Sequence, residues 1–351
     1  KLSPALENID SSSGAIGTTV NRAIEALVPI IAKAPADPAT RRKWLEQLYQ
    51  AHADDSIPYI ESLGDFWGEL CANADLAGEW GDRLAETVET VWGRYPTEHG
   101  FFHATSMCLS AMLGAGKHDQ LLALIDKCPY QFWTYRQWGV KALVAMGKKS
   151  EALRYAEATQ GLNEPLGRIA EVCEAILLSS GLADEAYQRY ALAANRAGTY
   201  LATFRAICRK YPKMKPADVL SDLVASTPGE EGKWFAAAKD AKLYDLALKL
   251  GQRSPVDHRT LIRSAEDFAM TEPRFALNSG LLALYWICAG RAYEASVGDV
   301  QNAYDLTLRA ADVAQRRESA LKQIRQMLED FPQERFVRSA LANYTELWRD
   351  R

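Results

Sequence analysis

Residues 116–156, GKHDQLLALIDKCPYQFWTYRQWGVKALVAMGKKSEALRYA, contain one whole helical hairpin and the start of the next. Gly116 and Gly147 mark the two turns, and a lysine follows each of them. Apolar residues recur five, six and nine positions after the marks, as Leu121, Leu122 and Ile125 and as Ala152, Leu153 and Ala156. This spacing puts the side chains on one face of an α-helix. Since a glycine after an apolar helical run commonly ends the helix with a positive φ, the stretch predicts a helix–turn–helix repeat.

The same register recurs along the chain after Gly181, Ala241 and Gly298. Successive marks lie 31, 34, 60 and 57 residues apart, and each long gap has room for another hairpin, for example helices near 199–211 and 216–226. A period in the low thirties is typical of tetratricopeptide-like solenoids, whose repeats bury their apolar faces against their neighbours. The Trp, Gly and Pro consensus of that family does not recur. We therefore predict an all-α fold, an α-solenoid of antiparallel helix pairs with degenerate tetratricopeptide-like repeats.

Two breaks, at Pro96–Gly100 and at Ser254 with Pro255, divide the predicted helices into three segments. The segments are an N-terminal helical subregion (1–96), helical-hairpin repeats (97–253), and C-terminal helical repeats with a polar cap (254–351). Outside the hairpins we expect helices near 14–34, 38–53, 58–73, 76–94, 257–271, 274–297, 299–315, 317–330 and 333–349. Asp37 before Pro38 predicts a capped start for the second of these, because proline suits the first helical position.

Composition and charge exclude few functions, but they make some functions less expected than others. The chain has 351 residues, of which 48% are hydrophobic and 25% charged, so it can bury a large core. A formal net charge of -4 gives no global reason to bind nucleic acid or an anionic membrane. A local basic stretch exists at Arg209, Lys210, Lys213 and Lys215, which is the usual composition of a solvated helix face.

Cysteine usage and hydropathy indicate the compartment. The six cysteines lie among apolar helical residues without paired spacing: Cys71, Cys108, Cys128, Cys173, Cys208 and Cys288. Such usage is typical of a reduced, cytoplasmic protein. No apolar run approaches the roughly eighteen residues of a membrane span, and no signal peptide is visible. We therefore predict a cytoplasmic protein with no membrane contact.

Several stretches resemble a bacterial family of helical proteins of unknown function, DUF6880. The C-terminal pieces are DFA at Asp267–Ala269, AGRAYE at Ala289–Glu294 and DVQNAY at Asp299–Tyr304. The early stretch IDSSSGAIGTTVNRAIEAL, residues 9–27, is similar to the N-terminal portion of that family. The resemblance implies a bacterial source and a helical fold, and it implies no particular activity.

Candidate catalytic and metal-binding residues are few. His99 and His103 stand four residues apart beside Glu98, but a metalloprotease motif has its glutamate between the histidines, and no third ligand is suggested. Cys108 near His103 is a weak candidate for a thiol nucleophile, because it lies in the apolar run SMCLSAML. The sequence predicts no catalytic residue, no metal and no cofactor.

Two fragments, LGAGKH and PGEEGKWF, superficially resemble phosphate-binding loops. The position that requires glycine is Ala111 in the first fragment and Thr227 in the second. The residue after the lysine is His118 or Trp234, where a phosphate loop has Ser or Thr to bind magnesium. Neither fragment follows a predicted strand, so nucleotide hydrolysis is not expected.

The segment PYQFWTYRQWG, residues 129–139, is the most informative for binding. Aromatic residues and arginine are the types enriched at binding hot spots. On a helix starting near Gln131, Phe132, Tyr135 and Trp138 lie towards one side, and Trp133 and Arg136 are displaced from it, so some of the rings leave the core stripe. The candidate partner-binding residues are Tyr130, Trp133, Tyr135, Arg136 and Trp138. Packing between hairpins is the alternative fate for these rings.

The sequence thus favours a non-catalytic helical-repeat scaffold that binds a protein or peptide partner. A stacked array of helices makes a binding surface without any catalytic group. The alternative is a nucleic-acid-associated accessory protein, for which the basic stretch at 209–215 would share a face with Arg41, Arg42 and Lys43. An enzyme of unknown class is third, and it requires a polar cluster with perturbed pKa values in a cleft.

Overall fold

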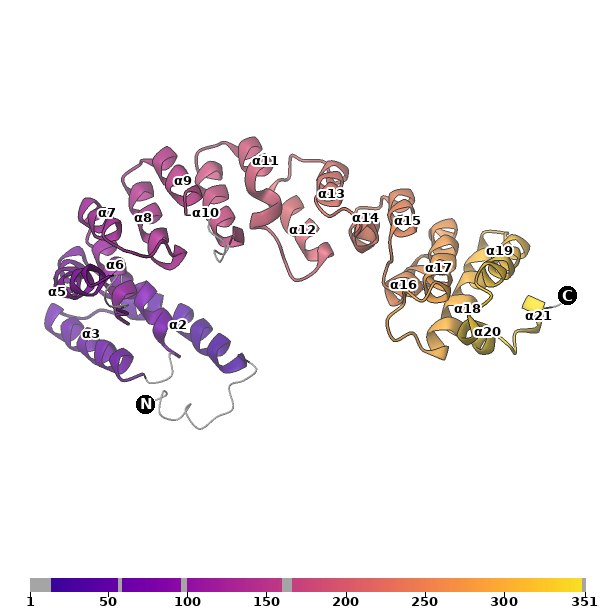
Figure 1. The fold of residues 1–351 in the computed structure, drawn as a ribbon, viewed down its shortest axis with the longest axis horizontal. Coiled ribbons are helices and arrows are strands. Elements are labelled where there is room, and N and C mark those ends of the chain that lie inside the picture. The colour runs from indigo at the N-terminus through magenta and orange to yellow at the C-terminus, as the bar shows by residue number, and fades with distance from the viewer. Residues whose placement is uncertain (1–13, 56–58, 96–99, 160–165, 349–351) are drawn as a thin grey trace. The chain divides into compact units, whose positions relative to one another are not determined.

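The computed structural model describes residues 14–55, 59–95, 100–159 and 166–348. It is 75% helix, with 20 α-helices that pack against their neighbours and two short 3₁₀ helices, and no strand occurs within those ranges. The all-α prediction is therefore confirmed. Contacts between Cα atoms divide the chain into two compact units, Lys1–Tyr190 and Ala191–Arg351. Figure 1 labels the helices along the chain.

In its described residues, the first unit contains ten helical elements before the division. They are α2 (Ala15–Lys33), α3 (Pro38–Ala53), η1 (Glu61–Phe66), α4 (Trp67–Leu70), α5 (Ala74–Gly93), α6 (Thr105–Gly114), α7 (His118–Asp126), α8 (Trp133–Ala145), α9 (Lys149–Glu157) and α10 (Leu166–Leu178). The next helix, α11 (Ala183–Ala194), crosses the division.

The second unit continues the helical hairpins. Its elements are α12 (Tyr200–Lys210), α13 (Pro216–Ala225), η2 (Glu231–Trp234), α14 (Phe235–Asp240), α15 (Tyr244–Arg253), α16 (His258–Phe268), α17 (Pro273–Cys288), α18 (Val297–Val313), α19 (Arg317–Asp330), α20 (Arg335–Ala340) and α21 (Thr345–Trp348). Many helices contact the next helix and also the one after it, as α6 contacts α7 and α8 and α17 contacts α18 and α19.

The turns between paired helices share one backbone conformation. Gly116, Gly147 and Gly181 have φ values of 72°, 76° and 76°, as the repeat register predicts. The N–H of the residue after each glycine donates to a carbonyl in the last turn of the preceding helix, as Lys148 does to Leu143 over 2.9 Å. This is the Schellman motif, which pairs carbonyls that a helix end leaves without partners.

The same motif continues into the second unit, where two of its left-handed residues are not glycine. Lys242 and Gln315 have φ values of 60° and 54°. The bonds Leu243 N–H to Ala238, Arg291 N–H to Trp286 and Arg316 N–H to Ala311 complete the series. After five of these left-handed residues, the side chain five positions on is fully buried: Leu121, Ala152, Ala186, Ala247 and Ala320.

Two of the predicted marks therefore need correction. The left-handed residue at the fourth turn is Lys242, and Ala241 is the C-cap before it. Gly298 lies inside α18, whose start is fixed by a capping box between Ser296 and Asp299. A glycine in the sequence marks a turn only where the helix before it ends, and α17 already ends at Cys288.

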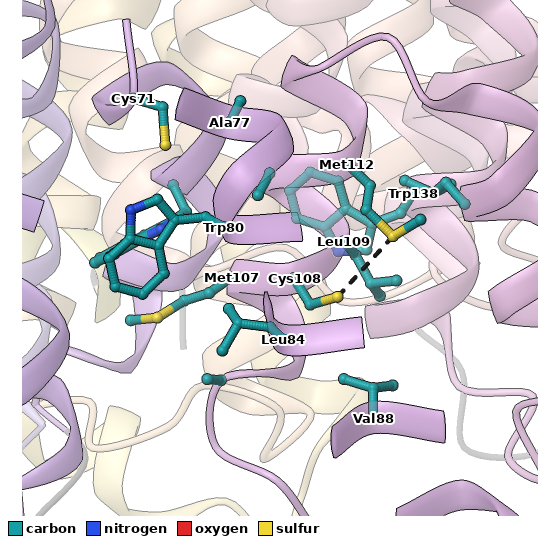
Figure 2. Close-up of a cluster of buried hydrophobic side chains, with 14 of the residues drawn as sticks. Cys71, Ala77, Trp80, Leu84, Val88, Met107, Cys108, Leu109, Met112 and Trp138 are labelled. Atoms are coloured by element: carbon teal, nitrogen blue, oxygen red, sulfur yellow. Dashed lines mark hydrogen bonds between the residues drawn. The ribbon is translucent and has the colours of Figure 1, made fainter. Parts of the chain in front are cut away.

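A continuous hydrophobic core crosses the predicted boundary at residue 96. Trp80, Leu84 and Val88 of α5 pack with Met107 and Cys108 of α6 (Figure 2). Because both sides of the break contribute to one core, 1–96 is not separated from the hairpins that follow it. The predicted boundary at 253 likewise falls between α15 and α16, inside the second compact unit.

Three predicted helices are shorter than expected. The helix predicted at 274–297 ends at Cys288, because Gly290 takes up a φ of 65° and closes it. Within 58–73, the chain forms η1 and α4, and Gly68 of α4 lies against α6 so closely that a Cβ atom there would be 2.3 Å from the Ser110 carbonyl oxygen. The predicted helix 333–349 is divided into α20 and α21. Leu341 is fully buried between them, and its carbonyl accepts a 3.1 Å hydrogen bond from Trp348 Nε1.

The Asp37 cap is confirmed, since its carboxylate accepts from the backbone N–H groups of Ala39 and Thr40 at 2.9 and 3.0 Å. These bonds and the Thr40 hydroxyl lower the pKa of Asp37.

Gly147→Val tests the repeat turn. A β-branched residue at a φ of 76° is strained, so the free energy of unfolding should fall by about 1 kcal/mol or more. Gly17→Val is the matched control, because Gly17 lies in α2 with open space around it and valine has the higher helix propensity. Urea denaturation of both variants measures the difference. An unchanged stability for Gly147→Val would contradict the assigned hairpin register.

Candidate functional site

An aromatic cluster lies in the loop before α8 and in the first turn of that helix. The rings of Tyr130 and Phe132 stack, with centroids 5.3 Å apart and an interplanar angle of 4°. Tyr95 meets Tyr130 edge-on at 5.7 Å, and Tyr135 meets Phe132 at 6.4 Å. Phe132 is 53% exposed and Tyr95 is 44% exposed. The cluster therefore presents stacked aromatic surface to solvent from the loop before α8.

The predicted contact residues are not all on this surface. Trp133, Tyr135 and Trp138 are buried, at 5%, 8% and 2% exposure. Trp138 lies in the core shown in Figure 2, and Tyr135 packs edge-on against Trp92 at 5.6 Å. In this fold these three rings pack in the interior and are not accessible to a partner.

The Arg136 side chain also makes a contact within the unit. Its guanidinium lies 4.2 Å from the centroid of the Tyr155 ring on α9. The Tyr155 ring in turn lies so close to Gly139 that a Cβ atom there would be 2.8 Å from it. Of the five predicted residues, Tyr130 is the one that shares the exposed cluster. The exposed ring that the prediction left out is Phe132, because α8 begins at Trp133 and not near Gln131.

Two opposite charges of the same unit interact with each other. The Lys141 ammonium lies 3.9 Å from the centroid of the Trp138 ring, and Lys141 interacts electrostatically with Asp65 of η1. Both side chains are exposed. We call the exposed cluster of Tyr95, Tyr130 and Phe132 the α8 surface.

Nearby protein atoms shift the pKa values of both groups. Burial raises the pKa of Asp65, and this effect exceeds the lowering by Lys141 and by a hydrogen bond with Ser106. Burial likewise lowers the pKa of Lys141, against the attraction of Asp65. Both side chains are nonetheless exposed, so water still reaches the two charged groups.

The cysteines have the properties of buried structural residues. Burial raises the pKa of Cys108 to about 12, and it raises the pKa values of Cys71 and Cys288 to about 12 as well. A thiol nucleophile needs a lowered pKa, so these positions do not suit catalysis. In the ranges that the structure describes, no group of three His, Cys, Asp or Glu residues has the arrangement of a metal site. His99 lies outside those ranges.

The lysines of the two fragments that resemble phosphate-binding loops form ion pairs with carboxylates. Lys117 forms an ion pair with Asp82, and Lys233 forms one with Glu230 at 2.6 Å. Gly116, which precedes Lys117, is the left-handed residue that ends α6. These fragments are therefore helix-terminal structures in this fold.

The basic residues divide by role. Arg209, Lys210, Lys213 and Lys215 are exposed. Arg41, in contrast, is 5% exposed and donates to the carbonyls of Ile31 and Ala34 at 2.7 Å each. Arg42 pairs with Glu79. The expected basic face at Arg41–Lys43 is therefore wrong for Arg41, whose guanidinium satisfies the end of α2.

The helix α2 differs from the expectation that no segment suits a membrane. Ala15–Lys33 has 19 residues with a mean hydropathy of 1.2, so its length and composition would allow it to cross a bilayer. Leu27 and Ile30 are 52% and 65% exposed. In this structure α2 contacts η1 and α4, and Val28 is buried in the core of the unit.

Comparison of the chain with family models, curated proteins and solved structures gave no match. The resemblance to the DUF6880 family stays a prediction from the sequence.

The raised pKa of Asp65 predicts how stability depends on pH. A carboxyl whose folded pKa exceeds its unfolded value binds more protons when folded, so its contribution to stability falls as pH rises from 3.8 through the raised pKa. Asp65→Asn removes this titration. We expect the stability of the variant relative to the wild type to increase across that window, measured by urea denaturation at several pH values. Parallel pH profiles for the two proteins would contradict the assignment.

Proposed function

We propose that this protein is a non-catalytic α-solenoid of degenerate tetratricopeptide-like hairpins that binds a protein partner through the α8 surface. The recurrence of one turn motif supports the repeat, as does the contact of a helix with both of its successors within a unit. A cytoplasmic, bacterial setting is part of the same proposal, and it rests on cysteine usage and on the family resemblance.

The observation that carries the proposal is the exposure of Phe132 over a rigid base. Its ring is 53% exposed and stacked on Tyr130, and the helix that follows is anchored by Trp133 and Trp138 in the core. An aromatic ring fixed in this way loses little conformational entropy on binding. Aromatic anchors of this kind contribute most of the affinity at protein interfaces.

Two opposite charges of the same unit extend the proposal. Lys141 and Asp65 are both exposed. A partner that reaches them from the α8 surface would need an acidic side chain for Lys141 and a basic one for Asp65. Such charge pairs give an interface its orientation and specificity.

Phe132→Ala combined with Lys141→Gln should weaken partner binding by about 2 kcal/mol or more, because it removes an aromatic anchor and a charge. The partner is first captured from native-host extract on the wild-type protein and identified by mass spectrometry. Its affinity for purified wild type and variant is then measured by calorimetry. Both substituted side chains are exposed, so thermal stability should be nearly unchanged.

Tyr293→Ala is the matched control, since it removes an aromatic ring that is 83% exposed in the other unit. It should leave the affinity unchanged. Equal affinities for wild type and the double variant would contradict the α8 surface as the binding site.

Nucleic-acid binding is the second candidate, and the exposure of the basic stretch Arg209–Lys215 favours it. If it is correct, affinity for mixed DNA and RNA should fall steeply between low and moderate salt. Lys213→Ala with Lys215→Ala should then flatten the salt slope by about one unit per lost phosphate contact. Absence of binding at low salt would remove this candidate.

A further inference from the structure

A cavity of about 610 Å³ lies between α15 and α17, and three cations line it. They are Lys242, Lys249 and Arg274. Within the described part of the chain, none of the three forms an ion pair within 4.0 Å, whereas Arg205, Lys233 and Arg317 of the same unit do. Unpaired cations around one cavity attract an anionic group.

Two carboxylates also line the cavity, and each has a local reason to be there. Asp245 lies in the first turn of α15, and Glu272 is the N-cap of α17. Negative charge at a helix N-terminus is stabilising. Lys242 follows the C-terminal end of α14, where positive charge is favourable. Arg274 has no such reason, because it is the second residue of α17, where positive charge lowers the stability of the fold.

The backbone conformation of Lys242 has a cost to the fold. Its φ of 60° places it in the left-handed region, at the position that Gly116, Gly147 and Gly181 occupy in the other turns. A residue with a Cβ atom is disfavoured there relative to glycine. Strained residues of this kind concentrate at ligand-binding positions.

The cavity is apolar as well as basic. Leu243, Leu246 and Leu248 contribute half-buried side chains to it. Its aromatic rings are not free for stacking, because Tyr244 packs against Phe275 with a centroid separation of 4.8 Å and Phe275 is 4% exposed. Single-stranded nucleic acids bind through exposed rings on which bases stack. An anion with apolar side chains fits this lining better than a base does.

We propose that the cavity between α15 and α17 binds an acidic peptide segment of the partner, with glutamate or aspartate at the three cations and an apolar side chain against the leucines. The volume lies in the range of small-ligand sites. This inference rests on the proposed function, because it assigns a second contact and its chemistry to the same class of partner.

The probe is a short fluorescein-labelled peptide of alternating glutamate and leucine, and binding to the full chain is followed by fluorescence anisotropy. Lys249→Gln with Arg274→Gln should weaken binding about tenfold or more, because charge-assisted hydrogen bonds are lost. A peptide with glutamine in place of glutamate should bind at least about tenfold more weakly for the same reason. Equal binding of the two peptides would overturn the proposal.

Lys242→Gly gives the sharpest test, because its two effects have opposite signs. Removing the strain should raise the melting temperature, while removing the cation should weaken peptide binding several-fold. Gln315→Gly is the matched control, since it relieves the same backbone conformation outside the cavity and should leave peptide binding unchanged. Full binding by Lys242→Gly, or an equal loss in Gln315→Gly, would overturn the proposal.

Two further arms separate the alternatives. If a single-stranded oligonucleotide binds through the same three residues more tightly than the peptide, the ligand is nucleic acid and the proposal is wrong. Phe132→Ala should not affect probe binding at the cavity. If Phe132→Ala loses partner capture but neither wild type nor variant binds the peptide probe, the cavity proposal alone is contradicted. If the probe binds but partner capture does not depend on Phe132, the α8 surface alone is contradicted.

Discussion

Several helix ends of this protein depend on the same type of backbone hydrogen bond. The N–H of the residue after a left-handed residue donates to a carbonyl in the last turn of the helix. The bond from Lys148 N–H to the Leu143 carbonyl is one of six such bonds in the described ranges. Each ends a helix abruptly and reverses the chain, so that the next helix packs against the last. Small or apolar residues such as Ala152 and Leu121, five positions after the turn, then lie fully inside.

This constraint explains where the chain has freedom to function. Between the turns at Gly116 and Gly147, the loop before α8 carries Tyr130 and Phe132. The buried side chains of Trp133 and Trp138 anchor the helix that follows this loop. The exposed rings are therefore presented on a rigid support. Where the turn residue is Lys242 and not glycine, the fold keeps a left-handed backbone conformation that glycine would adopt at lower cost, as it also does at Gln315.

The chemistry of the interior favours binding over catalysis. Burial raises the pKa of Cys108 to about 12, and the lysines that follow the loop-like glycines are paired with carboxylates. Asp65 and Lys141 are instead exposed and attract each other. Exposed charges of this kind are available to a partner of complementary charge.

The sequence by itself determined the helical class, the turns at Gly116, Gly147 and Gly181, and the cap at Asp37, because each follows from a period or from a residue's local backbone preference. It also indicated the aromatic segment, but not which rings are exposed. A shift of two residues in the start of α8 places Trp133 and Tyr135 inside and Phe132 outside. Only tertiary structure decided this, as it decided the burial of Arg41 and the cavity at Lys242. Those features depend on contacts between one helix and another, on which the periodicity within a helix carries no information.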